Sequence, residues 1–375
     1  MKLNHMDVLK RAWRILWSYK ALWVFGIILA LTTSRGGGGN NGGQATFSGG
    51  QGSGFDITPP PEIQRELGEV GEVLDRFFEQ IFNGGAIPGR LIALGVGLAC
   101  LVGLLIVVAT IARYVAETAL IKMVDDHETT GERRRVKEGF KFGWSRSAFR
   151  QWLIGLVIGV PLVVGFILAL ALAALPLLGW LTENVTLGIF GTIGSIGLFF
   201  LLIFVAIVIG TLAMVLVKLA WRAAALEDLG VLPSIGRGWA LIRTNAKDIA
   251  LMWLIMFGIG LGFAILLIPV VLLLLMISGV SGGLVFLVAR GLAELLVSGI
   301  ARWIVAGILG GTVFLALMAI PLAFIGGLYE VYRSTVWTLT YRELALTAPL
   351  VAQPGSPVAP HTESETPRLQ ADTAS

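Results

Sequence analysis

The stretch that decides the fold is IGLFFLLIFVAIVIGTLAMVLVK, which runs from Ile196 to Lys218. It carries no charge before Lys218, and it is long enough to cross a bilayer core as a helix, which takes about 20 apolar residues. The composition agrees, because 56% of the 375 residues are hydrophobic and only 14% are charged. Soluble domains carry about 25% charged residues. The sequence therefore predicts an all-α integral membrane protein.

Five other regions have the same apolar character, which gives six predicted transmembrane helices: Trp17–Thr33, Leu91–Ala112, Trp152–Leu175, Ile196–Lys218, Ile249–Ser278 and Trp303–Leu328. The region Leu284–Ile300 is ambiguous, since it is apolar except for Arg290 and Glu294. Two charges within the bilayer would make a seventh span costly. We therefore predict an outer interfacial or re-entrant helix there, with a seventh span as the alternative.

Most of the 28 lysine and arginine residues fall on one side of these spans. They lie in the N-terminal arm, in the loops after the second and fourth spans, and in the C-terminal segment. Loops rich in lysine and arginine stay in the cytoplasm. Both termini are therefore predicted to be cytoplasmic.

Three similar segments precede the odd-numbered spans: Leu9–Trp13, Val136–Phe140 and Ile235–Trp239. Each has a small residue before a large aromatic one, with a basic residue nearby. The pattern predicts a basic amphipathic helix at the cytoplasmic surface before each of three hairpins. The hairpins would share one orientation, as parallel repeats do.

The first of these surface helices has a predicted apolar face formed by Met6, Leu9, Trp13 and Leu16. Its basic side chains would sit among anionic lipid headgroups. Simple anchoring and orientation of the spans is the alternative interpretation. The candidate contacts with anionic lipid are Lys10, Arg11, Arg14, Arg133, Arg134, Arg135 and Arg237.

Residues 1–346 are predicted to form one membrane domain, and the proline-containing segment 347–375 a disordered cytoplasmic tail. Within the domain, residues 34–61 form a Gly-rich extracytoplasmic loop without the Gly-Lys-Ser/Thr ending of a phosphate loop. Residues 62–82 form an amphipathic helix with an acidic face. Anionic lipid repels that face, so its apolar stripe is expected to pack on the protein, on a partner or on a second copy.

We predict no catalytic, cofactor or metal site. The three histidines, His5, His127 and His361, do not share a helical face as zinc ligands would. The cluster from Asp125 to Glu128 is interpreted as a solvated loop, and Cys100 as a packing residue. Coupled carriers keep ionisable residues at mid-membrane, whereas Glu117, Lys218, Arg222, Glu330 and Arg333 all lie at span ends. Because topology explains the net positive charge, nucleic acid is not expected as a partner.

A family resemblance rests on Ala225–Val231 and on the following stretch Ile235–Leu241. These resemble the signature of bacterial membrane proteins grouped around the glycerophosphoryl diester phosphodiesterase membrane domain. Val124–Asp126 and Gly139–Phe140 match it more weakly. The resemblance implies a six-helix membrane fold in a bacterial plasma membrane. The soluble phosphodiesterase barrel of those proteins has no matching residues, so no catalytic residue is carried over.

These observations favour a non-enzymatic membrane scaffold or lipid-associated accessory whose partners are membrane lipids. The alternative is a transporter or channel for an apolar or amphipathic solute, with a pathway near Pro161 and Pro269. The substrate and the oligomeric state are left open.

Overall fold

The computed structural model describes residues 4–33, 89–182, 185–295 and 301–347, and every regular element within them is helical. The elements are α1 (His5–Ser18), α2 (Ala21–Thr33), α4 (Gly89–Thr130), α5 (Val136–Gly143), α6 (Arg146–Ala174), the 3₁₀ helix η1 (Leu175–Thr182), α7 (Val185–Leu226), α8 (Val231–Thr244), α9 (Ala246–Glu294) and α10 (Ala301–Thr347). The predicted Gly-rich loop, the 62–82 helix and the C-terminal tail lie outside the described residues.

Five described helices, α4, α6, α7, α9 and α10, are long and apolar enough to cross a membrane. The number rises to six if the bent pair α1 and α2 is one broken span. Four of the five, with 42 to 49 residues each, contain one predicted span and continue beyond it. The fifth, α6, covers the predicted span Trp152–Leu175 except for its last residue, Leu175, which begins η1. The prediction of an all-α chain with membrane-length helices is confirmed.

The first predicted span is not one straight helix. Tyr19 and Lys20 separate α1 from α2, and the two helices meet at 101°. With 13 residues, α2 is about 20 Å long, which is short of a bilayer core of about 30 Å. The chain turns here because the buried Tyr19 side chain is docked, its hydroxyl donating to the Arg134 carbonyl oxygen at 2.9 Å.

The region after residue 284 also differs from its prediction. Residues 284–294 are the last turns of α9, a single helix of 49 residues, and do not form a separate interfacial or re-entrant helix. Residues 296–300 lie outside the described part of the chain. The Arg290 guanidinium pairs with the Glu294 carboxylate at 3.7 Å. It also lies over the Trp303 ring, 3.9 Å from the ring centre, which holds these charges against the start of α10.

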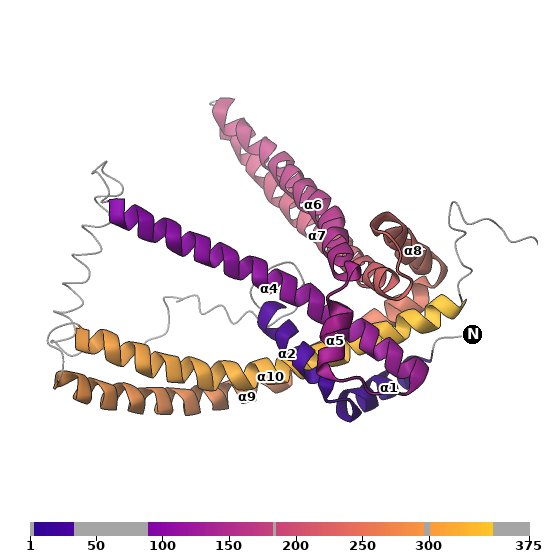
Figure 1. Cartoon of the computed structure of the whole chain (residues 1–375). Coiled ribbons are helices and arrows are strands. Elements are labelled where there is room, and N and C mark those ends of the chain that lie inside the picture. The colour runs from indigo at the N-terminus through magenta and orange to yellow at the C-terminus, as the bar shows by residue number, and fades with distance from the viewer. Residues whose placement is uncertain (1–3, 34–88, 183–184, 296–300, 348–375) are drawn as a thin grey trace, which may run out of the picture.

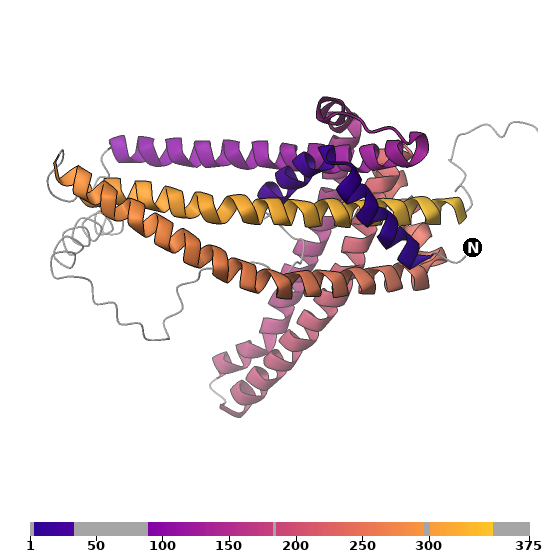
Figure 2. The same cartoon turned by 90° about the horizontal axis from the view of Figure 1, so that it is seen from below.

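The long helices pack together at one end and diverge at the other (Figures 1 and 2). We call the packed part the closed end; it comprises residues 113–130, 146–158, 215–226, 246–259 and 328–346 of the long helices, with α1, α2, α5 and α8. The remaining parts are the arms. In the arms α6 runs beside α7 and α9 beside α10, while α4 stands apart (Figure 1).

The buried apolar side chains concentrate at the closed end. One cluster joins α1, α2, α4, α9 and α10, a second joins α7, α8, α9 and α10, and a third joins α6, α7 and α8. Along the arm of α4, by contrast, every described side chain from Gly95 to Val108 is exposed. Such an apolar exterior is what a helix presents to lipid.

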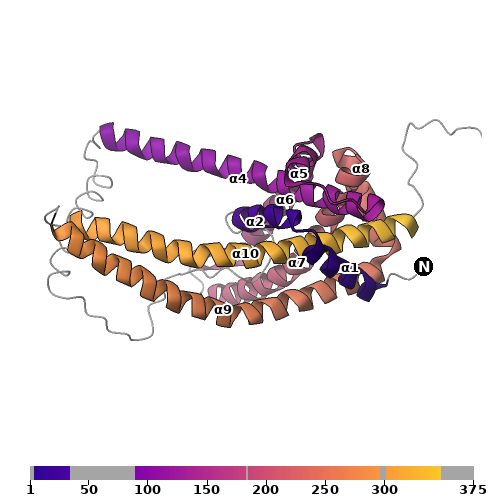
Figure 3. The same ribbon diagram turned by 60° about the horizontal axis from the view of Figure 1, so that its bottom comes forward.

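The short helices α1, α5 and α8 lie where the three repeated segments predict helices (Figure 3). The structure explains why a small residue precedes the aromatic one in each segment. Ala12, Gly139 and Gly238 are all buried, and a Cβ on Gly238 would lie only 3.2 Å from the Ala220 nitrogen. The repeated pattern therefore marks how each short helix docks on the long ones.

Candidate functional site: a charged pocket at the closed end

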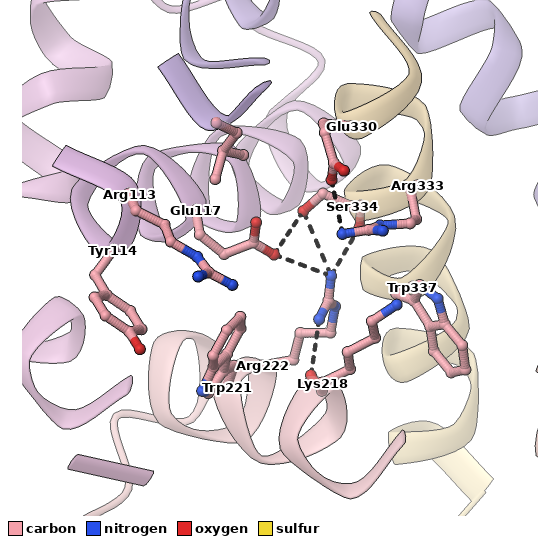
Figure 4. A pocket seen from close by; sticks show the side chains of 11 residues that line it. Arg113, Tyr114, Glu117, Lys218, Trp221, Arg222, Glu330, Arg333, Ser334 and Trp337 are labelled. Carbon is pink, nitrogen blue, oxygen red and sulfur yellow. Dashed lines mark hydrogen bonds and ion pairs between the residues drawn. The ribbon is translucent and has the colours of Figure 1, made fainter. Parts of the chain in front are cut away.

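Three long helices direct polar side chains into one small cavity at the closed end (Figure 4). We call it the charged pocket. On each helix the contributing positions are three or four residues apart, which places them on one face. The lining residues are Leu29 from α2; Arg113, Tyr114 and Glu117 from α4; Lys218, Trp221 and Arg222 from α7; and Glu330, Arg333, Ser334 and Trp337 from α10.

Arg222 is the centre of the hydrogen-bond network. Its side chain is 1% exposed and donates to the Lys218 carbonyl oxygen at 2.8 Å and to the Ser334 carbonyl oxygen at 3.1 Å. Its guanidinium also lies 3.6 Å from a carboxylate oxygen of Glu117. The Ser334 hydroxyl donates to the same Glu117 oxygen at 3.1 Å. A buried guanidinium needs such partners because its desolvation is costly, so the network ties α4, α7 and α10 together.

The other cations of the pocket make different contacts. The Lys218 ammonium lies 5.4 Å from the centre of the Trp337 ring, and no carboxylate of the described residues lies within 4.0 Å of it. Arg333 pairs with Glu330 at 2.8 Å. Figure 4 shows the Arg113 guanidinium directed toward the same space as that of Arg222. The lining thus holds four cationic side chains against two carboxylates.

Sequence reasoning located five of these charges at span ends and did not predict that they meet. The available signal was their helical spacing, as in Arg113 with Glu117 and Lys218 with Arg222. Spacing places two residues on one face of a helix but does not say which helix that face contacts. Ser334 and Trp337 were missed because neither is charged.

The seven predicted lipid-contact residues divide into two groups. The structure leaves Lys10, Arg14, Arg133 and Arg135 exposed. The other three are held by carboxylates of the protein, which leaves them less available to lipid. Arg11 pairs with Glu128 and Glu343, Arg134 with Asp126 and Glu132, and the 5%-exposed Arg237 with Glu227.

The acidic cluster from Asp125 to Glu128 was interpreted as a solvated loop, and that interpretation is wrong. All four residues belong to the last turns of α4. Asp125 pairs with Arg342, Asp126 with Arg134, and Glu128 with Arg11. The cluster therefore fastens α1, α10 and the segment before α5 to α4. Among the described residues, no group of three or more His, Cys, Asp or Glu side chains could hold a metal ion.

A model of a family of unknown function, DUF7544, matches residues 6–341. The chain belongs to this family. The matched range runs from α1 into the last turns of α10, so it includes most of the closed end and the whole charged pocket. No curated protein and no solved structure matches the chain. The resemblance to the phosphodiesterase membrane domain stays a prediction, because the DUF7544 match does not bear on it.

In this DUF7544 member the motif behind that resemblance is a structural junction. Glu227 accepts a hydrogen bond of 2.5 Å from the Tyr341 hydroxyl of α10 and pairs with Arg237 of α8. Asp228 has a positive φ of 48° and receives the Arg150 guanidinium of α6 at 2.6 Å. The turn between α7 and α8 thus joins two further helices, which gives its acidic pair a structural role.

Proposed function

We propose that the protein is a non-enzymatic, lipid-associated membrane protein whose closed end faces the cytoplasm and contacts anionic lipid. The observation that carries this proposal is the exposed face of α1. The buried face consists of Val8, Ala12, Ile15 and Leu16. On the opposite side Met6, Lys10, Trp13, Arg14 and Trp17 are exposed, and their spacing of three or four residues makes them neighbours.

Aromatic rings extend that face across the closed end. Trp13 and Trp17 are 56% and 49% exposed, and their ring centres are 5.8 Å apart. Trp17 contacts Trp23 of α2, and Trp23 contacts Phe324 of α10. Tryptophan prefers the headgroup level of a bilayer, and cations beside it attract anionic headgroups. The exposed face of α1 and the aromatic rings that continue it therefore have the composition of a surface that binds at a membrane interface.

An open groove of about 610 Å³ lies at the bend between α1 and α2. Lys20, Arg133 and Arg135 line it and are exposed, beside the apolar side chains of Ala21 and Val24. Tyr19, at the bend between α1 and α2, also lines the groove. Burial raises the pKa of its hydroxyl to about 12. Cations next to apolar surface suit a headgroup with its acyl chain.

The transporter alternative gains less from the geometry. Neither the charged pocket nor the groove is lined by Pro161 or Pro269, where a pathway was predicted. A catalytic role gains no support from Glu117, because Arg222 and Ser334 engage its carboxylate. The proposed orientation rests on the excess of lysine and arginine at this end, and the bacterial plasma membrane on the family resemblance.

The test is to measure the anionic lipid that stays with the full-length protein after mild detergent extraction. The variant K10Q/R14Q/R133Q/R135Q neutralises four exposed cations. We expect it to retain several-fold less phosphatidylglycerol than the wild type at low salt, since each surface cation contributes about 1 kcal/mol of attraction. Added salt should narrow the difference, because it screens exposed charges.

The matched control is K137Q/K141Q/R243Q/K247Q, which removes four exposed cations from α5, α8 and α9. It has the same charge as the test variant, but leaves α1 and the groove intact. Equal loss of lipid from both variants would reject the proposed contact face. Loss that does not respond to salt would reject its electrostatic basis.

A further inference from the structure

The groove at the bend between α1 and α2 gathers cations from two separate segments. Lys20 comes from the bend itself, and Arg133 and Arg135 come from the segment before α5. All three are exposed, and no carboxylate of the described residues forms an ion pair with any of them. The lining of the groove includes no carboxylate either. Three cations in one concave site therefore face a ligand rather than a partner within the described chain.

The segment that carries the two groove arginines is held in place by contacts that do not use their charges. Arg134, which stands between Arg133 and Arg135, pairs with Asp126 of α4 at 2.8 Å. Its carbonyl oxygen accepts a hydrogen bond of 2.9 Å from the hydroxyl of Tyr19. These two contacts fasten the segment to α4 and to the bend. Cations on a fixed segment bind an anion at a lower entropic cost than cations on a freely moving one.

An apolar strip on α2 begins in the groove. Ala21 and Val24 line it, and Leu31 lies seven residues after Val24, so the two share one side of the helix. Val24 and Leu31 are 39% and 54% exposed. A ligand that carries both a phosphate and an acyl chain contacts the cations and the strip together, whereas a free anion uses the cations alone. The groove therefore favours a lipid.

The number of cations indicates the kind of headgroup. A phosphomonoester has three terminal oxygens and, with a second pKa of about 6, carries nearly two negative charges at neutral pH. A phosphodiester headgroup carries one charge and has two such oxygens. Arginine pairs with phosphate through two parallel hydrogen bonds. With about 610 Å³, the groove lies within the usual range for small-molecule sites of about 300–1,000 Å³.

We propose that this groove is a site for one phospholipid with a phosphomonoester headgroup, of which phosphatidic acid is the simplest. Lys20, Arg133 and Arg135 contact the phosphate, and Val24 contacts an acyl chain. The inference rests on the proposed function, because it needs the closed end to meet anionic lipid. It adds a selectivity among anionic headgroups that the exposed face of α1 does not provide.

The test compares two anionic lipids that differ in the phosphate. The full-length protein is reconstituted with equal amounts of phosphatidic acid and phosphatidylglycerol and extracted in mild detergent, and the retained lipids are quantified. We expect the wild type to retain about fivefold more phosphatidic acid, because one further charge beside surface cations changes binding by about that factor. The preference should shrink at about pH 5, where the phosphomonoester loses its second charge.

Three variants locate the preference. K20Q/R133Q/R135Q neutralises the groove and should retain the two lipids equally. K10Q/R14Q neutralises the exposed face of α1 and should retain less of both lipids, with their ratio unchanged. K141Q/R243Q/K247Q removes three exposed cations outside the groove and should behave as the wild type does. If the groove variant does not fold, K20Q alone should lower the preference.

Added inorganic phosphate distinguishes a lipid from a free anion. The preference should persist in millimolar phosphate as it does in sodium chloride of equal ionic strength, and its loss in phosphate alone would assign the groove to the free anion and overturn the lipid. The inference is also overturned if the wild type retains the two lipids equally, or if the groove variants keep the preference. Equal retention that still falls in K10Q/R14Q would leave the proposed contact with anionic lipid intact, whereas retention that no cation affects would overturn both.

Discussion

The same five long helices run through the closed end and the arms, yet the two regions are held together in different ways. At the closed end, residues 328–346 of α10 are mostly buried, and ion pairs link it to α4 and α1. In its arm, residues 304–320 of the same helix are largely exposed and apolar. A helix thus changes from a lipid-facing rod to a packed core element along its length. The comparison teaches that specificity of packing resides in the closed end, and four predictions test it.

The largest effect is expected from breaking the buried pair at the centre of the pocket. The variant R222M leaves the Glu117 carboxylate without its guanidinium partner. We expect a loss of about 3–5 kcal/mol in the free energy of unfolding, as for other buried pairs deprived of one member. Denaturant unfolding in detergent micelles would measure it. The double variant E117M/R222M should recover most of this loss, since an apolar pair needs no desolvation. R243M, at an exposed arginine of α8, is the control and should cost little.

A similar contrast applies to the aromatic side chains. Trp337 at the closed end is 1% exposed, whereas Phe200 in the arm of α7 is 67% exposed. W337A should cost about 3–5 kcal/mol, because it leaves a cavity in a packed core. F200A should cost under about 1 kcal/mol, because detergent or lipid fills the space where the ring was. Equal costs in the same unfolding assay would show that the arms are as tightly packed as the closed end.

Substitutions of two glycines compare a tightly packed position with an open one, and their effects on stability should be smaller than those above. A Cβ on Gly26 of α2 would collide with the Gly327 carbonyl oxygen and the Val331 side chain of α10, whereas one on Gly258 meets nothing within 4 Å. G26A should therefore cost about 1–3 kcal/mol through overpacking. G258A should be neutral or stabilise by up to about 1 kcal/mol, because alanine favours the helix. The thermal midpoint of G26A should fall while that of G258A stays the same or rises, and an equal fall of both would contradict the close approach of α2 to α10.

The smallest effect concerns Tyr19. Because its pKa is raised from 10.0 to about 12 in the folded protein, the neutral phenol is favoured in the fold. Its stabilising contribution is therefore complete below about pH 10 and is lost as the pH rises through about 12. The tyrosinate absorbance of the wild type, minus that of Y19F, should titrate near pH 12. A midpoint near 10 would show that Tyr19 is solvated and that the bend between α1 and α2 is not fixed by its contact with Arg134.

Several elements were readable without the tertiary structure, and others were not. The long helices and the short helices before α2, α6 and α9 follow from apolar runs and helical spacing. The bend at Tyr19 and the continuation of α9 to Glu294 do not, because each depends on a contact with a distant segment. The packing face of α1 was not readable from the sequence either. Val8, Ala12 and Ile15 pack on the core. Met6 and Trp13, which were predicted to belong to the apolar face, are exposed.

The sequence by itself determined that the chain is helical and rich in membrane-length spans. Apolar segments without water must satisfy their backbone hydrogen bonds internally, and a helix does so within about four residues. Only the tertiary structure decided that Glu117, Arg222 and Ser334 meet, since 217 residues separate Glu117 from Ser334 and 112 separate Arg222 from it. Helical periodicity fixes which side chains share a face, but the packing of whole helices decides which faces come together. That packing brings charged side chains of α4, α7 and α10 together in one pocket.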